Sequence, residues 1–194
     1  METQIKKRAE IDDIAAALKQ ERVVAFPTET VYGLGVIYDS PRAVERLIEA
    51  KQRDMSKRFT LMLSDKEELD EYVYVSYRDQ FIIDKFMPGD ITVILNSKKE
   101  EGTIGIRIPD DAFVRELIRK TGKPLYVTSA NISHRPSTTT TEEVLEQLNG
   151  RIPFVVEGEC GKLQASSVVD LTTDEIKILR QGRITIEMIE EELK

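Results

Sequence analysis

The fold is decided by the stretch VVAFPTETVYGLG, which runs from Val23 to Gly35. Its first four residues predict a buried strand, and Pro27 ends that strand because proline cannot donate to a central ladder. The next five residues predict a loop with two hydroxyls, a carboxylate and a phenol, followed by two glycines that let the backbone turn or approach a ligand. Ligands of open α/β sheets lie outside the carboxyl ends of strands, so we expect a binding loop here. Taken alone, the short motif fits an ordinary polar turn equally well.

Composition favours one soluble globular domain over residues 1–194. The chain has 194 residues, 40% hydrophobic and 32% charged, which is enough for one well-packed core and too short for two. A net charge of -7 argues against a protein that coats nucleic acid with a uniformly basic surface. Any site that binds anions must therefore be a local cluster of cations. One cysteine, Cys160, and one histidine, His134, form neither an intrachain disulfide nor a Cys/His metal site. No apolar segment predicts a leader or a membrane span, so we expect a cytoplasmic protein that binds no membrane.

Hydrophobic periodicity and turn residues predict interleaved strands and helices. Helices are predicted over residues 11–20, 40–51, 67–72, 80–87, 110–122 and 184–193, with one more after Thr141, and strands over 23–26, 59–63, 91–95, 102–109, 125–127, 154–156, 167–171 and 176–179. In residues 102–109 three isoleucines share one face and Arg107 lies on the other, so we expect Arg107 to be presented and not buried. The class is therefore α/β, with a large mixed sheet and helices on its faces.

Cations, hydroxyls and amides recur after the predicted strands and helices. The set comprises Thr30, Lys51, Arg53, Arg107, Ser129, Asn131, Ser166 and Arg180, with Thr103 and Thr139 nearby. Singly, each has an ordinary explanation: cations past a helix end stabilise its dipole by about 0.3 to 1 kcal/mol, Ser and Asn favour turns, and surface ion pairs contribute little. Together they suit a ligand with phosphates and a small polar head.

Seven short motifs follow one another along the chain. They are FPTETVYGLG at Phe26–Gly35, K-x-R at Lys51–Arg53, Pro88-Gly89 before a strand, G-x-R at Gly105–Arg107, S-x-N at Ser129–Asn131, SSVVD at Ser166–Asp170 and LRQG at Leu179–Gly182. Each motif is weak alone, but the ordered set covers nearly the whole chain and resembles the YrdC/YciO family, in particular its short bacterial branch. The resemblance implies a twisted α/β sheet bent around a concave basic cavity.

The resemblance also implies an activity, that of an L-threonylcarbamoyladenylate synthase, a nucleotidyltransferase. Such an enzyme converts L-threonine, hydrogencarbonate and ATP into threonylcarbamoyl-AMP and pyrophosphate, the first step toward N6-threonylcarbamoyladenosine at position 37 of tRNA. Carried over by position, the threonine ligands are Thr30, Arg107, Ser129 and Ser166, the ATP ligands are Arg53, Lys57, Thr103, Asn131, Thr139 and Arg180, and the catalytic residues are Lys51 and Arg53. Mg²⁺ is expected with ATP, held through the phosphates without protein ligands. The implied partners include tRNA and downstream threonylcarbamoyl-transferase proteins.

One departure from the family pattern keeps other functions open. Longer members carry Asn-Pro-Leu and a histidine shortly after K-x-R, where this chain has Lys57 to Met62. A YciO-like paralogue with weak or different activity is therefore an alternative. A module that binds tRNA or double-stranded RNA is another, although the net charge of -7 and the lack of interleaved aromatics argue against it.

Overall fold

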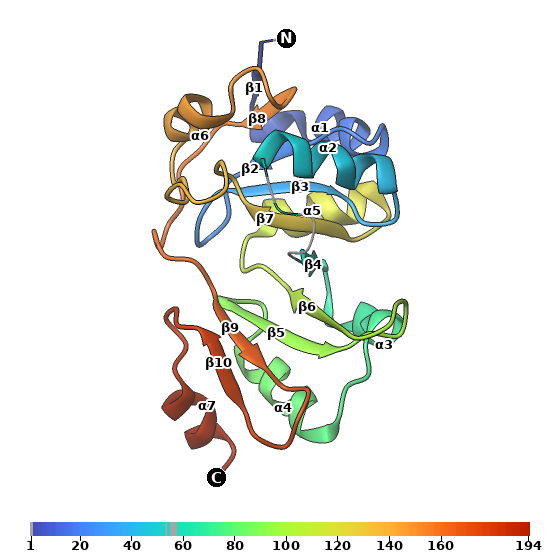
Figure 1. The fold of residues 1–194 in the computed structure, drawn as a ribbon, viewed down its shortest axis with the longest axis vertical. Coiled ribbons are helices and arrows are strands. Elements are labelled where there is room, and N and C mark those ends of the chain that lie inside the picture. The colour runs from blue at the N-terminus through green and yellow to red at the C-terminus, as the bar shows by residue number, and fades with distance from the viewer. Residues whose placement is uncertain (1, 53, 55–57) are drawn as a thin grey trace.

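One mixed sheet runs along the length of the molecule (Figure 1). The computed structural model describes residues 2–52, 54 and 58–194. Its ten strands lie in the order β1-β8-β2-β3-β7-β4-β6-β5-β9-β10. They are β1 (Gln4–Lys6), β2 (Val24–Phe26), β3 (Gly33–Ile37), β4 (Thr60–Met62), β5 (Ile91–Asn96), β6 (Thr103–Arg107), β7 (Leu125–Ser129), β8 (Phe154–Val156), β9 (Ser167–Asp170) and β10 (Lys177–Arg180). β3 runs antiparallel to β2 and β7, whereas β4 runs parallel to β6, so the predicted large mixed sheet is confirmed.

Helices pack against both halves of this sheet (Figure 1). The half that contains β2, β3 and β7 carries α1 (Ile11–Lys19), α2 (Pro41–Lys51), α5 (Ala112–Thr121) and α6 (Thr141–Leu148), and the half that contains β5 and β9 carries α3 (Leu69–Tyr72), α4 (Tyr77–Phe86) and α7 (Ile186–Glu192). Two short 3-10 helices, η1 (Arg8–Glu10) and η2 (Lys66–Glu68), precede α1 and α3.

Local sequence explains where these helices begin and end. The side chain of Ser40 caps α2, whose first residue is Pro41, and Asp111 and Thr140 cap α5 and α6 in the same way. α5 ends at Gly122, which has a φ of 73° and so adopts the left-handed conformation that glycine tolerates best. These caps confirm the predicted boundaries. α4 begins at residue 77 and not at the predicted residue 80, because the residue that caps it is at position 76.

Buried side chains form two clusters along the sheet, where composition predicted one core. The larger contains Phe26, Leu47 and Val127, and the smaller contains Ile83 and Ile106. The two clusters meet at the partly buried Tyr126, whose ring packs against both. A ten-stranded sheet is too long for the helices of one half to cover the other, so each half buries its own apolar face.

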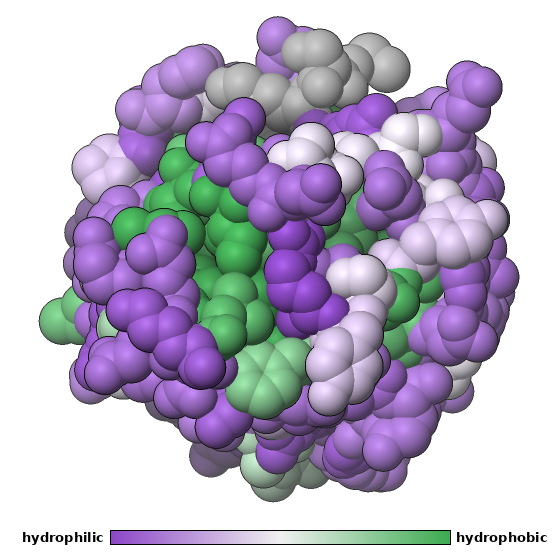
Figure 2. Space-filling view, turned by 90° about the horizontal axis from the view of Figure 1, so that it is seen from below, coloured by the Kyte–Doolittle hydropathy of each residue, from purple (hydrophilic) through white to green (hydrophobic). Residues whose placement is uncertain are grey.

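The end of the molecule formed by α4, β10 and α7 shows apolar residues gathered within a hydrophilic rim (Figure 2). Leu179 and Met188, in β10 and α7, keep 60% and 41% of their surface exposed, and Leu193 keeps 38%. Within the described residues, no helix combines the length and the apolar character needed to cross a membrane.

Two of the strands, β1 and β3, were not predicted from the sequence. β1 is three residues long and polar, and it forms only because Gln4 to Lys6 pair with one edge of β8. β3 begins at Gly33, so the predicted loop ends at Tyr32 and its glycines are strand residues. Glycine is required there, since a Cβ on Gly35 would lie 2.8 Å from Cε1 of the buried Phe26 ring.

We expect Gly35→Ala to destabilise the protein by about 1 to 3 kcal/mol, because the new methyl group has to displace an aromatic ring in a packed core. Urea unfolding followed by circular dichroism measures this difference. Gly161→Ala is the matched control, since the nearest atom to its new Cβ lies 3.8 Å away. Equal unfolding midpoints for the two variants would contradict the close approach of Phe26 to β3.

Candidate active site

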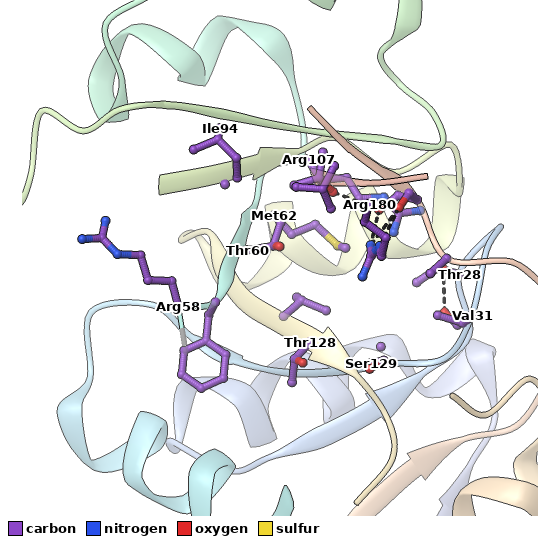
Figure 3. A pocket seen from close by; sticks show the side chains of 18 of the residues that line it. Thr28, Val31, Arg58, Thr60, Met62, Ile94, Arg107, Thr128, Ser129 and Arg180 are labelled. Atoms are coloured by element: carbon purple, nitrogen blue, oxygen red, sulfur yellow. Dashed lines mark hydrogen bonds between the residues drawn. The ribbon is translucent and has the colours of Figure 1, made fainter. Parts of the chain in front are cut away.

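A cavity of about 340 Å³ opens onto the middle strands of the sheet (Figure 3). Its polar lining includes Thr28, Arg58, Thr60, Thr92, Thr103, Arg107, Thr128, Ser129, Ser166 and Arg180. Three of the described lining residues are arginines and none is acidic. A cavity with this lining attracts anions, although the chain as a whole is acidic.

The loop between β2 and β3 is held at both ends. At its start, the hydroxyl of Thr28 donates to the carbonyl of Val31 at 2.7 Å and accepts from the amide of Thr30 at 3.1 Å. At its end, the Tyr32 hydroxyl lies 2.8 Å from the carbonyl oxygen of Gly158. Burial raises the pKa of Tyr32 to about 12, so this phenol stays protonated and keeps donating. The loop therefore presents its side chains in a fixed conformation.

A buried ion pair links this loop to β6. Nη2 of Arg107 donates to Oε1 of Glu29 at 2.7 Å and to Oγ1 of Thr30 at 2.9 Å. The two charged side chains are 8% and 9% exposed, so the expectation that Arg107 is presented to solvent is wrong. The reason is that the β2–β3 loop reaches Arg107 on the face of β6 opposite its isoleucines, where Glu29 and Thr30 accept hydrogen bonds from it. Nε of Arg107 and Oε2 of Glu29 have no hydrogen-bond partner among the described residues.

A second guanidinium, that of Arg180, lies beside Ser166 and close to Arg107 (Figure 3). Nε and Nη2 of Arg180 donate to the Ser166 carbonyl at 3.0 and 2.8 Å, and Nη2 is also 3.1 Å from the Ser166 hydroxyl. That hydroxyl lies 3.0 Å from Oγ1 of Thr92. Arg180 is exposed as a whole residue, yet partial desolvation lowers the pKa of its guanidinium, and the nearby charge of Arg107 lowers it further. An anion between the two guanidiniums would relieve this repulsion.

Lys51 is the last residue of α2 and its side chain is buried. Its ammonium donates to the carbonyl oxygens of Ser129 and Asn131 at 2.6 and 2.8 Å and to Oδ1 of Asn131 at 3.0 Å. These bonds tie the end of α2 to the end of β7. The Asn131 amide nitrogen in turn donates to the carbonyls of Ile132 and Arg135. In this structure Lys51 and Asn131 thus order the loop after β7.

The structure brings together most of the other residues predicted from the sequence. Thr103, Arg107, Ser129, Ser166 and Arg180 line the cavity directly, and Thr30 contacts it through Arg107. Thr139 bonds instead to Glu143 in the first turn of α6, and neither it nor Asn131 is among the described lining residues. Arg53 and Lys57 fall outside the described residues.

Several lining residues were missed by the sequence analysis. They are Arg58, Phe59, Thr60, Met62, Thr92, Ile94 and Thr128, whereas Thr28 belongs to the predicted binding loop. The available signal was the two-residue period of strands: Thr60 and Met62 on β4, like Thr92 and Ile94 on β5, alternate with residues of the apolar core. Among the described residues, no group of three or more histidine, cysteine or acidic side chains is placed to hold a metal ion.

The sequence and the fold of this chain are similar to those of known proteins. The Sua5/YciO/YrdC family model, which carries the description "Telomere recombination", matches residues 16–182. The chain belongs to this family.

Among members of the Sua5/YciO/YrdC family, the threonylcarbamoyl-AMP synthase of Bacillus subtilis is 36% identical over 192 residues, covering 93% of this chain and 56% of the relative. The enzyme of the same name from Vibrio campbellii is 34% identical over 183 residues, covering 88% of this chain and 98% of the relative. A crystal structure of P. abyssi Sua5 complexed with L-threonine superposes with a TM-score of 0.93 at 29% identity, over 98% of this chain and 61% of that one. The chain thus spans little more than half of some relatives and nearly all of others.

The buried ion pair predicts a double-mutant result. Arg107→Met leaves the Glu29 carboxylate buried without its cation, and we expect a loss of about 3 to 5 kcal/mol in unfolding free energy. The double variant Glu29→Gln/Arg107→Met removes both charges, so it should be more stable than Arg107→Met alone. Urea titrations of the wild type, both single variants and the double variant measure the coupling. Strictly additive losses would contradict a coupled pair.

A second prediction concerns alkaline pH. Burial raises the pKa of the Cys160 thiol to about 11, above the ordinary value of roughly 8.5. Because the folded state holds this proton more tightly, the stabilisation is complete below about pH 8.5 and is lost as pH rises toward 11. Unfolding free energy should fall across this window, on the order of 3 kcal/mol in total, and fall less in Cys160→Ala. Parallel pH profiles for the two proteins would refute the assignment.

Proposed function

We propose that this protein is an L-threonylcarbamoyladenylate synthase that supplies the activated intermediate for tRNA modification. The observation that carries the proposal is the cavity itself, where two guanidiniums and the hydroxyls of Ser129 and Ser166 converge and none of the described lining residues is acidic. The names of the Bacillus and Vibrio relatives, and the threonine bound by P. abyssi Sua5, support the same substrates.

L-Threonine would bind at the Arg107 side of the cavity. Nη2 of Arg107 is fixed by Glu29 and Thr30, so the guanidinium of this lining residue is already oriented for the substrate carboxylate. The Ser166 hydroxyl, held between Thr92 and Arg180, offers a further contact. Since these groups are already oriented, binding costs little additional ordering.

The chemical step would depend on positioning more than on proton transfer. The amine of threonine forms a carbamate with dissolved carbon dioxide, and a carbamate oxygen attacks the α-phosphorus of ATP. The bond from that phosphorus to the bridging oxygen of the β-phosphate breaks, and pyrophosphate leaves. The positive lining holds the two anionic substrates close together and stabilises the charge that develops, with Mg²⁺ entering as the ATP complex.

Only some of the predicted ATP ligands line the cavity. Thr103 and Arg180 lie on the cavity wall, and Arg58, which the sequence analysis did not assign to ATP, lies beside Thr103 with its guanidinium donating to the Thr103 carbonyl. We propose that Arg58 belongs to the same nucleotide side. Contacts from Arg53, Lys57, Asn131 and Thr139 to ATP remain predictions, as do a catalytic role for Lys51 and the roles of hydrogencarbonate, tRNA, downstream transferases and a cytoplasmic location.

One observation favours the paralogue as the second candidate. The segment that departs from the longer family members reaches the cavity, since Arg58, Thr60 and Met62 all line it. A change at this wall alters the site where the substrates would meet. A YciO-like protein with different substrate selectivity would have the same fold and the same two guanidiniums.

The purified protein should convert L-threonine, hydrogencarbonate and MgATP into threonylcarbamoyl-AMP and pyrophosphate, both detected by mass spectrometry or a coupled assay. Ser166→Ala should weaken threonine binding in calorimetry by about 10-fold to 100-fold, because a hydrogen bond to a charged group is lost. Ser137→Ala, an exposed serine outside the described lining, is the control. Threonine binding without product would favour the paralogue, and neither binding nor product would reject the synthase.

A further inference from the structure

A second cavity, of about 520 Å³, lies on another part of the same half of the molecule. It is enclosed by the last turns of α2, the turn before β2 and the turn between α6 and β8 (Figure 1). The described residues that line it are Arg22, Val23, Arg46, Glu49, Ala50, Gly150, Arg151 and Pro153. It shares no lining residue with the first cavity, so nothing in the proposed synthase reaction explains it.

Three arginines from three separate segments meet at this cavity. Arg46 is fixed, because its Nη1 donates to the carbonyl oxygen of Glu21 at 2.8 Å. The guanidinium of Arg22 lies over the ring of Phe154, with 5.8 Å between Cζ and the ring centroid. In the described part of the chain, neither Arg22 nor Arg151 forms an ion pair with a carboxylate. Elsewhere in the described residues, cations such as Arg42 and Lys123 are paired with carboxylates, so the guanidiniums of Arg22 and Arg151 have more donor groups left for a ligand.

The rest of the lining limits what the ligand can be. Val23, Ala50 and Pro153 form an apolar wall beside the guanidiniums, and Pro153 is its more exposed part because Val23 and Ala50 are 3% and 4% exposed. Glu49 adds one carboxylate, which leaves a formal charge of about +2 from three arginines and one acid. The volume lies within the range of small-molecule sites. A bare inorganic anion would leave the apolar wall unused, whereas an anion with a flat organic part would cover it.

We propose that this second cavity binds a nucleoside phosphate, with the phosphate on the arginines and the base on the apolar wall. Arginine suits this chemistry because its planar fork donates to two phosphate oxygens at once. The source of the nucleotide is either a free mononucleotide or an exposed nucleotide of an RNA. Both present the same phosphate and base to the cavity.

The test is a chemical-shift titration of the ¹⁵N-labelled full chain with adenosine 5′-monophosphate. We expect the amides of Val23, Ala50 and Gly150 to shift, while those of Gly33 and Gly105 report separately on the first cavity. The double variant Arg22→Ala/Arg151→Ala should raise the dissociation constant at the second cavity at least 10-fold. Both arginines are exposed, so the variant should fold, and its amide spectrum verifies this.

Arg42→Ala is the matched control for the loss of charge. Arg42 lies on the same helix as Arg46 but is paired with Glu21 and does not line the cavity, so this variant should bind within 2-fold of the wild type. Adenosine without phosphate should bind at least 10-fold more weakly than the monophosphate. An RNA stem-loop that shifts the same amides when the mononucleotide does not would identify RNA as the source.

Three results would overturn the proposal. The first is that neither the mononucleotide nor the RNA shifts the amides around the second cavity. The second is that Arg42→Ala weakens binding as much as the double variant does, which indicates general attraction of anions. The third is that adenosine binds as tightly as its phosphate. None of these outcomes bears on synthase activity, so this proposal and the proposed function fail or stand separately.

Discussion

The site depends on one buried ion pair, between Arg107 on β6 and Glu29 in the loop after β2. Two charges at this depth are costly to desolvate, and the contact is favourable only while both partners and their hydrogen bonds are in place. Glu29 also accepts from the backbone amide of Asp110, so one carboxylate fixes both the arginine and the segment after β6. The unpaired Nε and Oε2 leave the pair incompletely satisfied, which fits an arrangement built to receive a further polar group.

Lys51 is a second buried charge held by oxygen acceptors. Its ammonium donates to oxygens of Ser129 and Asn131, and this joins the end of α2 to the end of β7. The ammonium of a lysine, on its flexible side chain, can change hydrogen-bond acceptors more easily than the planar guanidinium of an arginine can. The conformation of the loop after β7 therefore depends on which groups the ammonium of Lys51 binds.

Much of this fold could be predicted from the sequence because its signals are local. Caps such as Ser40 and Asp111, and the alternation in residues 102–109, place most helices and strands. β1 was not predicted because its polar residues form a strand by pairing with β8. β3 was not predicted because it contains two glycines, which leave room for the Phe26 ring. The burial of Arg107 could not be inferred from β6 alone, since the loop that covers it lies some 78 positions away in sequence. Arg107, Ser129, Ser166 and Arg180, which the ordered motifs contain, line the cavity, whereas the contributions of Arg58 and Thr92 depend on how distant strands align.

β4 is only three residues long, yet it lies between β7 and β6 and so joins the two buried clusters. The first cavity takes lining residues from both sides of this strand, with Ser129 on one side and Arg107 on the other. A ligand held there contacts both halves at once, and its binding free energy adds to the stability of each. Ligand binding at the cavity should therefore make the opening and unfolding of the two halves more cooperative.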